Sequence, residues 1–169
     1  AVERLVRAKG RPDGKPLPLL AAGLDQLEAV AALGPLAREL GGAFWPGPLT
    51  LVVPARPGLH PAITGGGGTV GVRVTSSPVA AALARQAGGA LVATSANLAG
   101  EPPAASAAAL DAALAARLDL VLDAGPAPGG LASTVVAVEE GGAGARLRLL
   151  RAGPIGAEAI AAVAGIPVE

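Results

Sequence analysis

The chain has very few large side chains from which to build a core. Of its 169 residues, one is tryptophan, one is phenylalanine and none is tyrosine, although 51% are hydrophobic. The core must therefore consist of many leucine, valine and alanine side chains, each of which buries little area and must pack closely. A chain of about 150 residues can bury roughly 70% of its unfolded surface, so we expect one domain over residues 1–169.

Short apolar runs alternate with helical patterns along the chain. These patterns predict strands over residues 17–22, 50–54, 69–74, 90–94, 118–122, 135–139 and 146–150. They predict helices over residues 1–9, 25–33, 35–40, 78–87, 106–117 and 157–164, and loops over 65–68 and 124–131. Strands and helices alternate first and a glycine-rich hairpin follows, which indicates an α/β (α+β) fold: a mixed sheet with helices packed on it.

Several classes of protein are excluded by composition. There is no cysteine and His60 is the only histidine, so a disulfide framework and a zinc site are ruled out. The net charge of +0 and a pI near 6.9 argue against a surface dedicated to nucleic acid, although a local basic patch stays open. No apolar run reaches the roughly 20 residues of a membrane span, and no signal peptide is visible, so we expect a soluble cytoplasmic protein.

Lysine is used sparingly and in one place. The chain has eleven arginines but only two lysines, Lys9 and Lys15, and they bracket Arg11. An ammonium is a compact, strongly hydrated point charge that suits phosphate oxygens. This segment is therefore a candidate phosphate site, and the alternative is a solvated turn with two lysines left over from a biased composition.

Polar side chains gather where apolar strands begin or end, as they do at ligand sites of α/β sheets. The groups are Lys9, Arg11 and Lys15; Thr69 and Arg73; Thr94 to Asn97; and Ser133, Thr134 and Arg151. Cations, hydroxyls and one amide, without an acidic pair, indicate an anion site, which a nucleoside triphosphate would fit. Neither the phosphate-loop nor the dinucleotide glycine fingerprint is present.

Each candidate also has a structural interpretation. Arg73 could be a salt-bridged strand residue, and Ser95 and Asn97 could form a turn or cap a helix. Trp45, in a Trp-Pro-Gly-Pro turn, is better explained as a hydrophobic plug than as a base-stacking residue. His60 lacks an acidic neighbour in sequence and is better explained as a loop residue than as a general base.

Six ordered segments resemble one known family. They are Lys9-x-Arg11-Pro12-x-x-Lys15-Pro16-Leu17, Trp45-Pro-Gly-Pro-Leu-Thr50, Val72-Arg73-Val74, Thr94-Ser95-Ala96-Asn97-x-x-Gly100, Ser133-Thr134-Val135-Val136 and Leu150-Arg151-x-Gly153-x-Ile155. Their order and spacing resemble the YrdC family of L-threonylcarbamoyladenylate synthases, from residue 1 to about residue 155. The resemblance implies a twisted mixed sheet flanked by helices, with a concave basic face.

The resemblance also implies a reaction. Members of the family condense L-threonine, bicarbonate and ATP into threonylcarbamoyl-AMP and pyrophosphate, usually with Mg²⁺. Their product feeds N6-threonylcarbamoylation of adenosine 37 in tRNA, through a downstream tRNA threonylcarbamoyl transferase, and direct contact with tRNA is possible. The metal's ligands cannot be identified from this sequence.

The family's site residues transfer to matching positions of this chain. The resemblance implies catalytic roles for Lys9 and Arg11, ATP contacts for Arg11, Lys15, Thr69, Asn97 and Arg151, and threonine contacts for Arg73, Ser95 and Ser133. The chemistry agrees with such an inventory, because attack of a carbamate oxygen on the α-phosphorus needs charge neutralisation and alignment more than proton transfer.

This chain also departs from the family pattern. Members of the family begin ~40 to 50 residues earlier, with a strand and turn whose absence would leave an apolar edge open. Ala99 stands where a serine is common, Ala137 where an aspartate follows Ser-Thr-Val-Val, and Leu20 where some members have histidine. Two alternatives therefore stay open: a paralogue that makes another carbamoyl-adenylate, and a tRNA-binding or RNA-binding module on the same fold.

Overall fold

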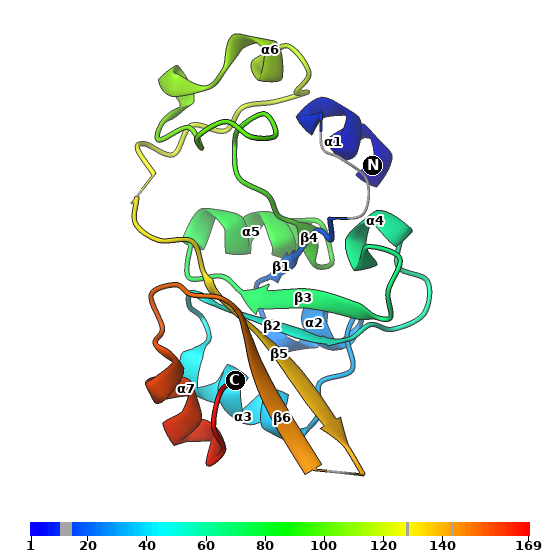
Figure 1. The fold of residues 1–169 in the computed structure, drawn as a ribbon. Coiled ribbons are helices and arrows are strands. Elements are labelled where there is room, and N and C mark those ends of the chain that lie inside the picture. Colours follow the sequence, from blue (N-terminus) through cyan, green and yellow to red (C-terminus); the bar gives the residue numbers. More distant parts are fainter. Residues whose placement is uncertain (11–14, 128, 143) are drawn as a thin grey trace.

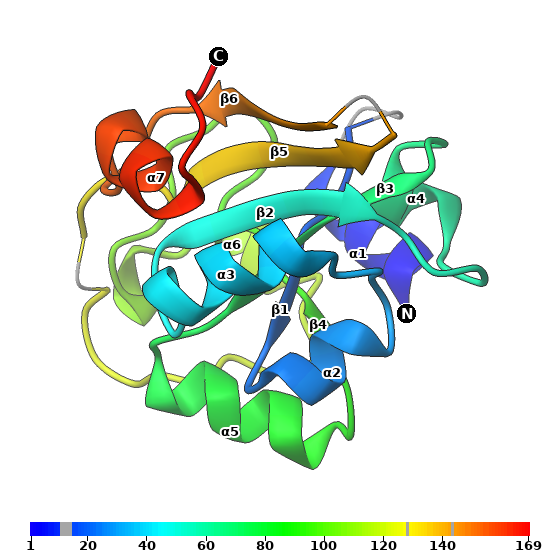
Figure 2. The same cartoon turned by 90° about the horizontal axis from the view of Figure 1, so that it is seen from below.

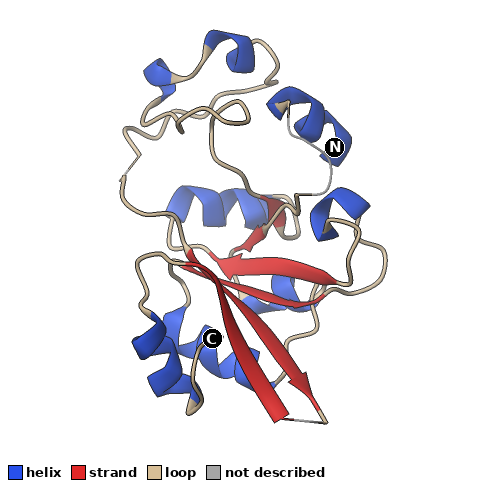
Figure 3. Ribbon diagram, in the orientation of Figure 1, coloured by secondary structure: helices blue, strands red, loops and turns tan. Residues whose placement is uncertain are grey.

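A mixed six-stranded sheet forms the centre of the molecule (Figures 1 and 3). The computed structural model describes residues 1–10, 15–127, 129–142 and 144–169. The strands are β1 (Leu19–Ala21), β2 (Leu49–Pro54), β3 (Thr69–Val74), β4 (Leu91–Val92), β5 (Thr134–Gly141) and β6 (Gly144–Arg151), in the spatial order β4-β1-β3-β2-β5-β6. Pairs β1–β3 and β2–β5 are parallel, and the other pairs are antiparallel. The predicted fold class is confirmed.

One face of the sheet carries the hydrophobic core. Side chains alternate between the two faces of a strand, and on β3 the buried core residues are Val70, Val72 and Val74. Helices α2 (Leu24–Glu28), α3 (Pro35–Phe44) and α7 (Ala157–Ala164) lie on this side of the sheet, as Figure 2 shows. Leu27, Leu40 and Ile160 are fully buried there, so three helices share the core with the sheet.

The remaining helical elements lie towards the other face and the edge of the sheet (Figure 1). They are α1 (Val2–Lys9), α4 (Pro61–Thr64), α5 (Pro78–Gln86), the 3₁₀ turn Ala107–Ala109 and α6 (Ala112–Ala115). Helix α1 lies beside the segment that follows α6: Arg4 pairs with Asp119 at 2.5 Å, and Arg117 donates to the carbonyl of Ala8 at 3.1 Å. These contacts join the first residues to a segment more than 100 positions later.

Most predicted elements appear at their predicted places. Helix α1 ends at Gly10, whose φ of 57° lies in the left-handed region that glycine tolerates. Trp45 lies against the core and its indole N–H donates to the Leu49 carbonyl at 2.7 Å, which supports the plug interpretation. His60 precedes a short helix that the sequence did not predict, and its Nδ1 accepts a hydrogen bond from the Ala62 amide.

The long alanine helix predicted over residues 106–117 is wrong. Ser106 caps only a 3₁₀ turn, and Leu110 then takes an extended conformation with ψ of 130°. Asp111 begins a second, four-residue helix, because its carboxylate accepts a hydrogen bond from the Leu114 amide at 2.9 Å. A local side-chain cap therefore prevails over the high helix propensity of alanine.

The strand predicted over residues 118–122 is also wrong. Within the described ranges no strand pairs with this segment, and Leu120 is 79% exposed. An apolar run becomes a strand only where a neighbour satisfies its backbone groups. Residues 118–122 have the residue types of a strand, but no neighbouring strand among the described residues pairs with them.

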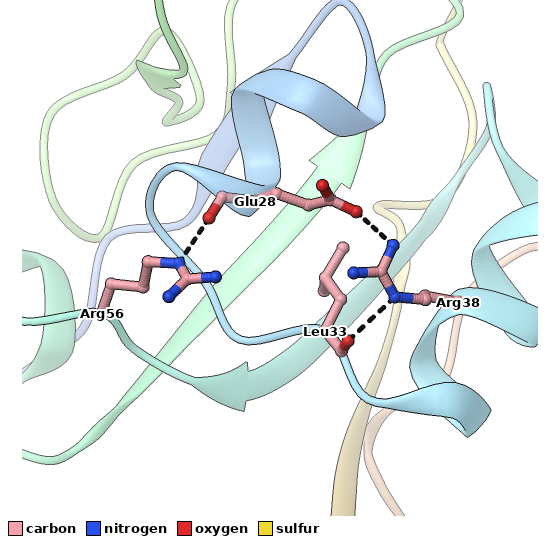
Figure 4. Close-up of polar contacts among 4 residues, drawn as sticks. All are labelled: Glu28, Leu33, Arg38 and Arg56. Atoms are coloured by element: carbon pink, nitrogen blue, oxygen red, sulfur yellow. Dashed lines mark hydrogen bonds and ion pairs between the residues drawn. The ribbon is translucent and has the colours of Figure 1, made fainter.

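Four polar contacts fix the ends of α2 and α3. Figure 4 shows Arg38 bonded to the Glu28 carboxylate and to the Leu33 carbonyl, while Arg56 donates to the Glu28 carbonyl. At the start of α3, Glu140 accepts a hydrogen bond from the Leu36 amide at 2.9 Å. Glu140 supplies from β5 the cap that Gly34, at the N-cap position, cannot supply.

Replacing Glu140 with alanine should destabilise the fold by about 1 kcal/mol, because the first turn of α3 loses its acceptor and its negative charge. We expect Glu140→Gln to recover part of this loss, since its amide oxygen can still accept. Thermal unfolding measures the difference. Glu139→Ala is the matched control: it removes only an exposed pair with Arg148 at 3.8 Å and should be nearly neutral. Equal losses in the two alanine variants would contradict the capping role.

Candidate functional site

Four polar residues meet on the sheet face opposite the core, and we call them the arginine cluster: Thr50, Arg73, Ser133 and Arg151. Thr50 and Arg73 alternate with core residues on β2 and β3, so both point to the opposite face. Ser133 directly precedes β5, and Arg151 ends β6 opposite Val135. The sheet thus gathers residues from four separate parts of the chain.

Ser133 is the centre of the hydrogen bonds in this cluster. The Arg151 guanidinium donates to the Ser133 carbonyl at 3.0 and 2.8 Å and to the Ser133 Oγ at 3.0 Å. The Thr50 hydroxyl lies 2.9 Å from the same Oγ. Thr50 is only 6% exposed, whereas Arg151 is exposed. The cluster therefore extends from the buried sheet to the surface.

Arg73 is the member of the cluster whose guanidinium has a shifted pKa. It is half-buried, and its pKa is lowered from the ordinary value first by burial and second by the positive charge of Arg151. Within the part of the chain that the structure describes, it makes no ion pair and no hydrogen bond. An arginine stays charged under such conditions, and burying it without an acceptor is unfavourable. The pair Arg73 and Arg151 is therefore suited to bind an anion, and the salt-bridge interpretation of Arg73 is not supported.

The backbone behind Ser133 is held by an unusually close approach. Thr134 is fully buried, and its hydroxyl donates to the Ile155 carbonyl at 2.8 Å and accepts from the Ile155 amide at 3.0 Å. A methyl group built on Gly153 would lie 2.3 Å from the Thr134 nitrogen and 2.5 Å from the Ala132 oxygen. Only glycine fits there, so Gly153 fixes the position of Ser133.

A second group of predicted residues, the lysine loop, consists of Lys9, Ser95 and Asn97. Lys9 is 5% exposed, and its ammonium donates to the Ser95 carbonyl at 2.5 Å, to the Asn97 carbonyl and to the Asn97 Oδ1 at 3.1 Å. The Ser95 hydroxyl donates to the same Oδ1, and the Asn97 amide donates to the Leu98 and Glu101 carbonyls. The lysine thus holds the loop that follows β4.

Strand register relates the lysine loop to the rest of the sheet. Leu19 of β1 pairs with Val72 on one side and with Val92 on the other, and Ala93 donates to the Pro18 carbonyl at 2.9 Å. The loop therefore leaves the sheet at the end where β3 begins. Thr69 is the first residue of β3 and is exposed, so it lies at the opposite end of that strand from Arg73.

The remaining candidates are less defined. Lys15 is exposed, and Arg11 lies outside the described residues. A cavity of about 380 Å³ between α1 and residues 117–120 is lined by Ala1, Leu5, Leu118 and their neighbours, and by none of the predicted site residues. Among the residues that the structure describes, no three of His, Cys, Asp or Glu gather as metal ligands, and no helix is long and apolar enough to cross a membrane.

Sequence reasoning missed one member of the arginine cluster. Thr50 stands in one of the quoted segments but received no role, because an isolated threonine is common in strands. The available signal was its position: it is the only polar residue in the run Leu49 to Val53 and alternates with the core leucines.

The fold is that of an α/β protein whose mixed sheet carries a cationic cluster on one face and a lysine-held loop after β4. The chain belongs to the Sua5/YciO/YrdC family, whose model, described as "Telomere recombination", matches residues 1–153. A "Threonylcarbamoyl-AMP synthase" of Xanthomonas campestris is 48% identical over 126 residues, which cover 73% of this chain and 67% of the relative. One of Bacillus subtilis is 39% identical over 167 residues, covering 98% of this chain and 47% of the relative.

A solved structure extends the similarity to three dimensions. The crystal structure of P. abyssi Sua5 complexed with L-threonine matches with a TM-score of 0.88 and 36% identity, covering 99% of this chain and 49% of that chain. The predicted family is thus confirmed, and the predicted class of activity is the one that the relatives' names state. The chain spans about two thirds of the first relative's length and about half that of the other two.

Replacing Gly153 with alanine should destabilise the protein by about 1 to 3 kcal/mol, because the added methyl group overlaps rigid backbone. We expect the same variant to bind threonine more weakly, since the overlap displaces Ser133. Differential scanning calorimetry and threonine titration measure the two effects. Gly42→Ala, in α3 with no atom within 4 Å of the added group, should be neutral or slightly stabilising. Unchanged melting and binding in Gly153→Ala would refute the close approach.

Proposed function

We propose that this chain forms the catalytic core of an L-threonylcarbamoyl-AMP synthase, in agreement with the names of its relatives. The threonine amine and bicarbonate give a carbamate and water. A carbamate oxygen then attacks the α-phosphorus of ATP, the bond from that phosphorus to the β-phosphate bridging oxygen breaks, and pyrophosphate leaves. Both partners of this step are anions, so the protein's task is to neutralise charge and align them.

The observation that carries the proposal is the half-buried Arg73 beside Arg151. A bidentate guanidinium suits a planar carboxylate, so we assign the threonine carboxylate to Arg73, with Ser133 and Ser95 as hydroxyl contacts. The similarity to P. abyssi Sua5 complexed with L-threonine supports this assignment.

The ATP contacts are assigned to the remaining cations and polar groups. Arg151, Lys15 and Arg11 would face the phosphates, with Thr69 and Asn97 at the loop end of the sheet. Lys9 and Arg11 keep the catalytic roles that the family signature implies. Because Lys9 already bonds to the Ser95–Asn97 loop, its charge also holds both loop side chains in place.

Mg²⁺ does not fit a site of its own among the described residues. No group of acidic or histidine side chains gathers there, and Mg²⁺ prefers oxygen ligands in octahedral geometry. The ion would enter bound to the ATP phosphates. In the cell, we propose that the product passes to a cytoplasmic tRNA threonylcarbamoyl transferase.

The purified full-length protein, given ATP, bicarbonate and labelled threonine, should release pyrophosphate only when threonine is present and should form labelled threonylcarbamoyl-AMP. A pyrophosphate-release assay and thin-layer chromatography measure the two products. Threonine-independent hydrolysis, or no turnover, would refute the proposal. Turnover with carbamoyl phosphate in place of threonine and bicarbonate would indicate a paralogue with another substrate. Tight binding of unmodified tRNA at physiological salt, without ATP binding, would favour an RNA-binding module.

Single arginine substitutions should separate the two ligands. We expect Arg73→Ala to weaken threonine about tenfold to hundredfold and ATP little, because a charge-assisted contact contributes ~1.5 to 3 kcal/mol. Arg11→Ala should do the reverse. Isothermal titration with each ligand measures the affinities, and Arg73→Lys is the control that keeps charge but loses the bidentate fork. Equal losses for both ligands in both alanine variants would show that the assignments are wrong.

A further inference from the structure

The inference concerns the protons of the two hydroxyls in the arginine cluster, and it rests on the proposed function. A hydroxyl has one hydrogen to donate and two lone pairs to accept with. The Ser133 Oγ lies 3.0 Å from Arg151 Nη2 and 2.9 Å from Thr50 Oγ1. A guanidinium can only donate, so Arg151 occupies one lone pair of Ser133.

The bond between Thr50 and Ser133 can run in either direction. If Ser133 donates to Thr50, the hydrogen of the Thr50 hydroxyl needs another acceptor. Among the described residues, the Ser133 Oγ is the only hydrogen-bond partner of the Thr50 side chain. Thr50 is 6% exposed, so water offers little help, and a buried donor without an acceptor is costly.

The opposite direction satisfies the buried hydroxyl of Thr50. Thr50 then donates to Ser133, whose two lone pairs are filled by Thr50 and Arg151. The single hydrogen of Ser133 is left without an internal acceptor and must point away from both donors. Ser133 can therefore only donate to a ligand, which suits a carboxylate and disfavours a ligand group that itself donates.

We propose that Thr50 is a positioning residue that makes Ser133 an obligate hydrogen-bond donor to the anionic substrate. It acts through Ser133 and need not contact the substrate itself. The same arrangement gives selectivity: in an uncharged analogue such as threonine amide, a donating NH2 replaces one carboxylate oxygen and must face either Arg73 or Ser133, which are both donors, so the analogue should bind more weakly than threonine.

The test compares three substitutions at position 50 in the full-length protein. Thr50→Val keeps the size but removes the hydroxyl, and should raise the KM for threonine about threefold to tenfold with little change in kcat. Thr50→Ser keeps the donor and should stay within about twofold of the original protein. Thr50→Cys, a weak donor of similar size, should also raise the KM, and it serves if the valine variant does not fold.

A double-mutant cycle shows whether the effect passes through Ser133. In a Ser133→Ala background, Thr50→Val should cause no further change in the KM for threonine, because the hydroxyl to be oriented is gone. Thr75→Val is the matched control: Thr75 is another buried threonine, whose hydroxyl accepts a hydrogen bond from the Ser77 amide, and its loss should lower the melting temperature without moving the KM.

Two results would overturn the inference: a Thr50→Val variant with an unchanged KM for threonine, or one whose effect persists fully in the Ser133→Ala background. Failure of the proposed function would give a different experimental result. In that case the original protein itself binds no threonine and forms no threonylcarbamoyl-AMP, whatever stands at position 50.

Discussion

The parallel pairing of β2 with β5 is the constraint on which the arginine cluster depends. It sets Leu49 to Val52 beside Thr134 to Ala137, although these segments are far apart in sequence. Parallel neighbours need a long connection, and here β3, β4 and the α5 and α6 regions lie between them in the chain. The pairing brings the Thr50 hydroxyl to Ser133, and the following hairpin returns Arg151 to the same place. The cluster is therefore a consequence of tertiary structure.

Lysine and arginine make different kinds of contact in this molecule. The buried ammonium of Lys9 bonds to two backbone carbonyls and an amide oxygen of one loop, a use that suits a compact group with three donors. Arg73 and Arg151 instead present planar forks on the sheet face, where the two neighbouring positive charges repel each other. Exchanging these residue types would disturb the loop in one case and ligand geometry in the other.

The sequence predicts where strands form more accurately than it predicts which side chains contact one another. Residues 69–74 were predicted at their observed bounds, because β-branched residues between glycine and a turn allow few other structures. The strand predicted over Leu118 to Leu122 was wrong, because no strand among the described residues pairs with this segment. The local sequence does not specify which strand will be a partner. Polar residues at strand ends pointed to Arg73 and Arg151, which the structure brings close together; their role as site residues stays a prediction. The mutual bonding of Lys9 with the Asn97 loop could not be predicted, since it depends on how α1 meets a segment 86 or more positions away.

The charges of the described site residues bear on how the reaction can proceed. Burial, and then the positive charge of Arg151, lower the pKa of Arg73, and a guanidinium is a donor that does not act as a base in proteins. The imidazole of His60 caps α4, and its Nε2 lies 3.8 Å from Oε1 of Glu3. Both contacts lie on elements other than those that carry the arginine cluster. General acid–base catalysis requires a group that titrates near the working pH. The four residues of the arginine cluster include no carboxylate and no imidazole, so the contributions for which these side chains are equipped are charge neutralisation and alignment of anionic groups.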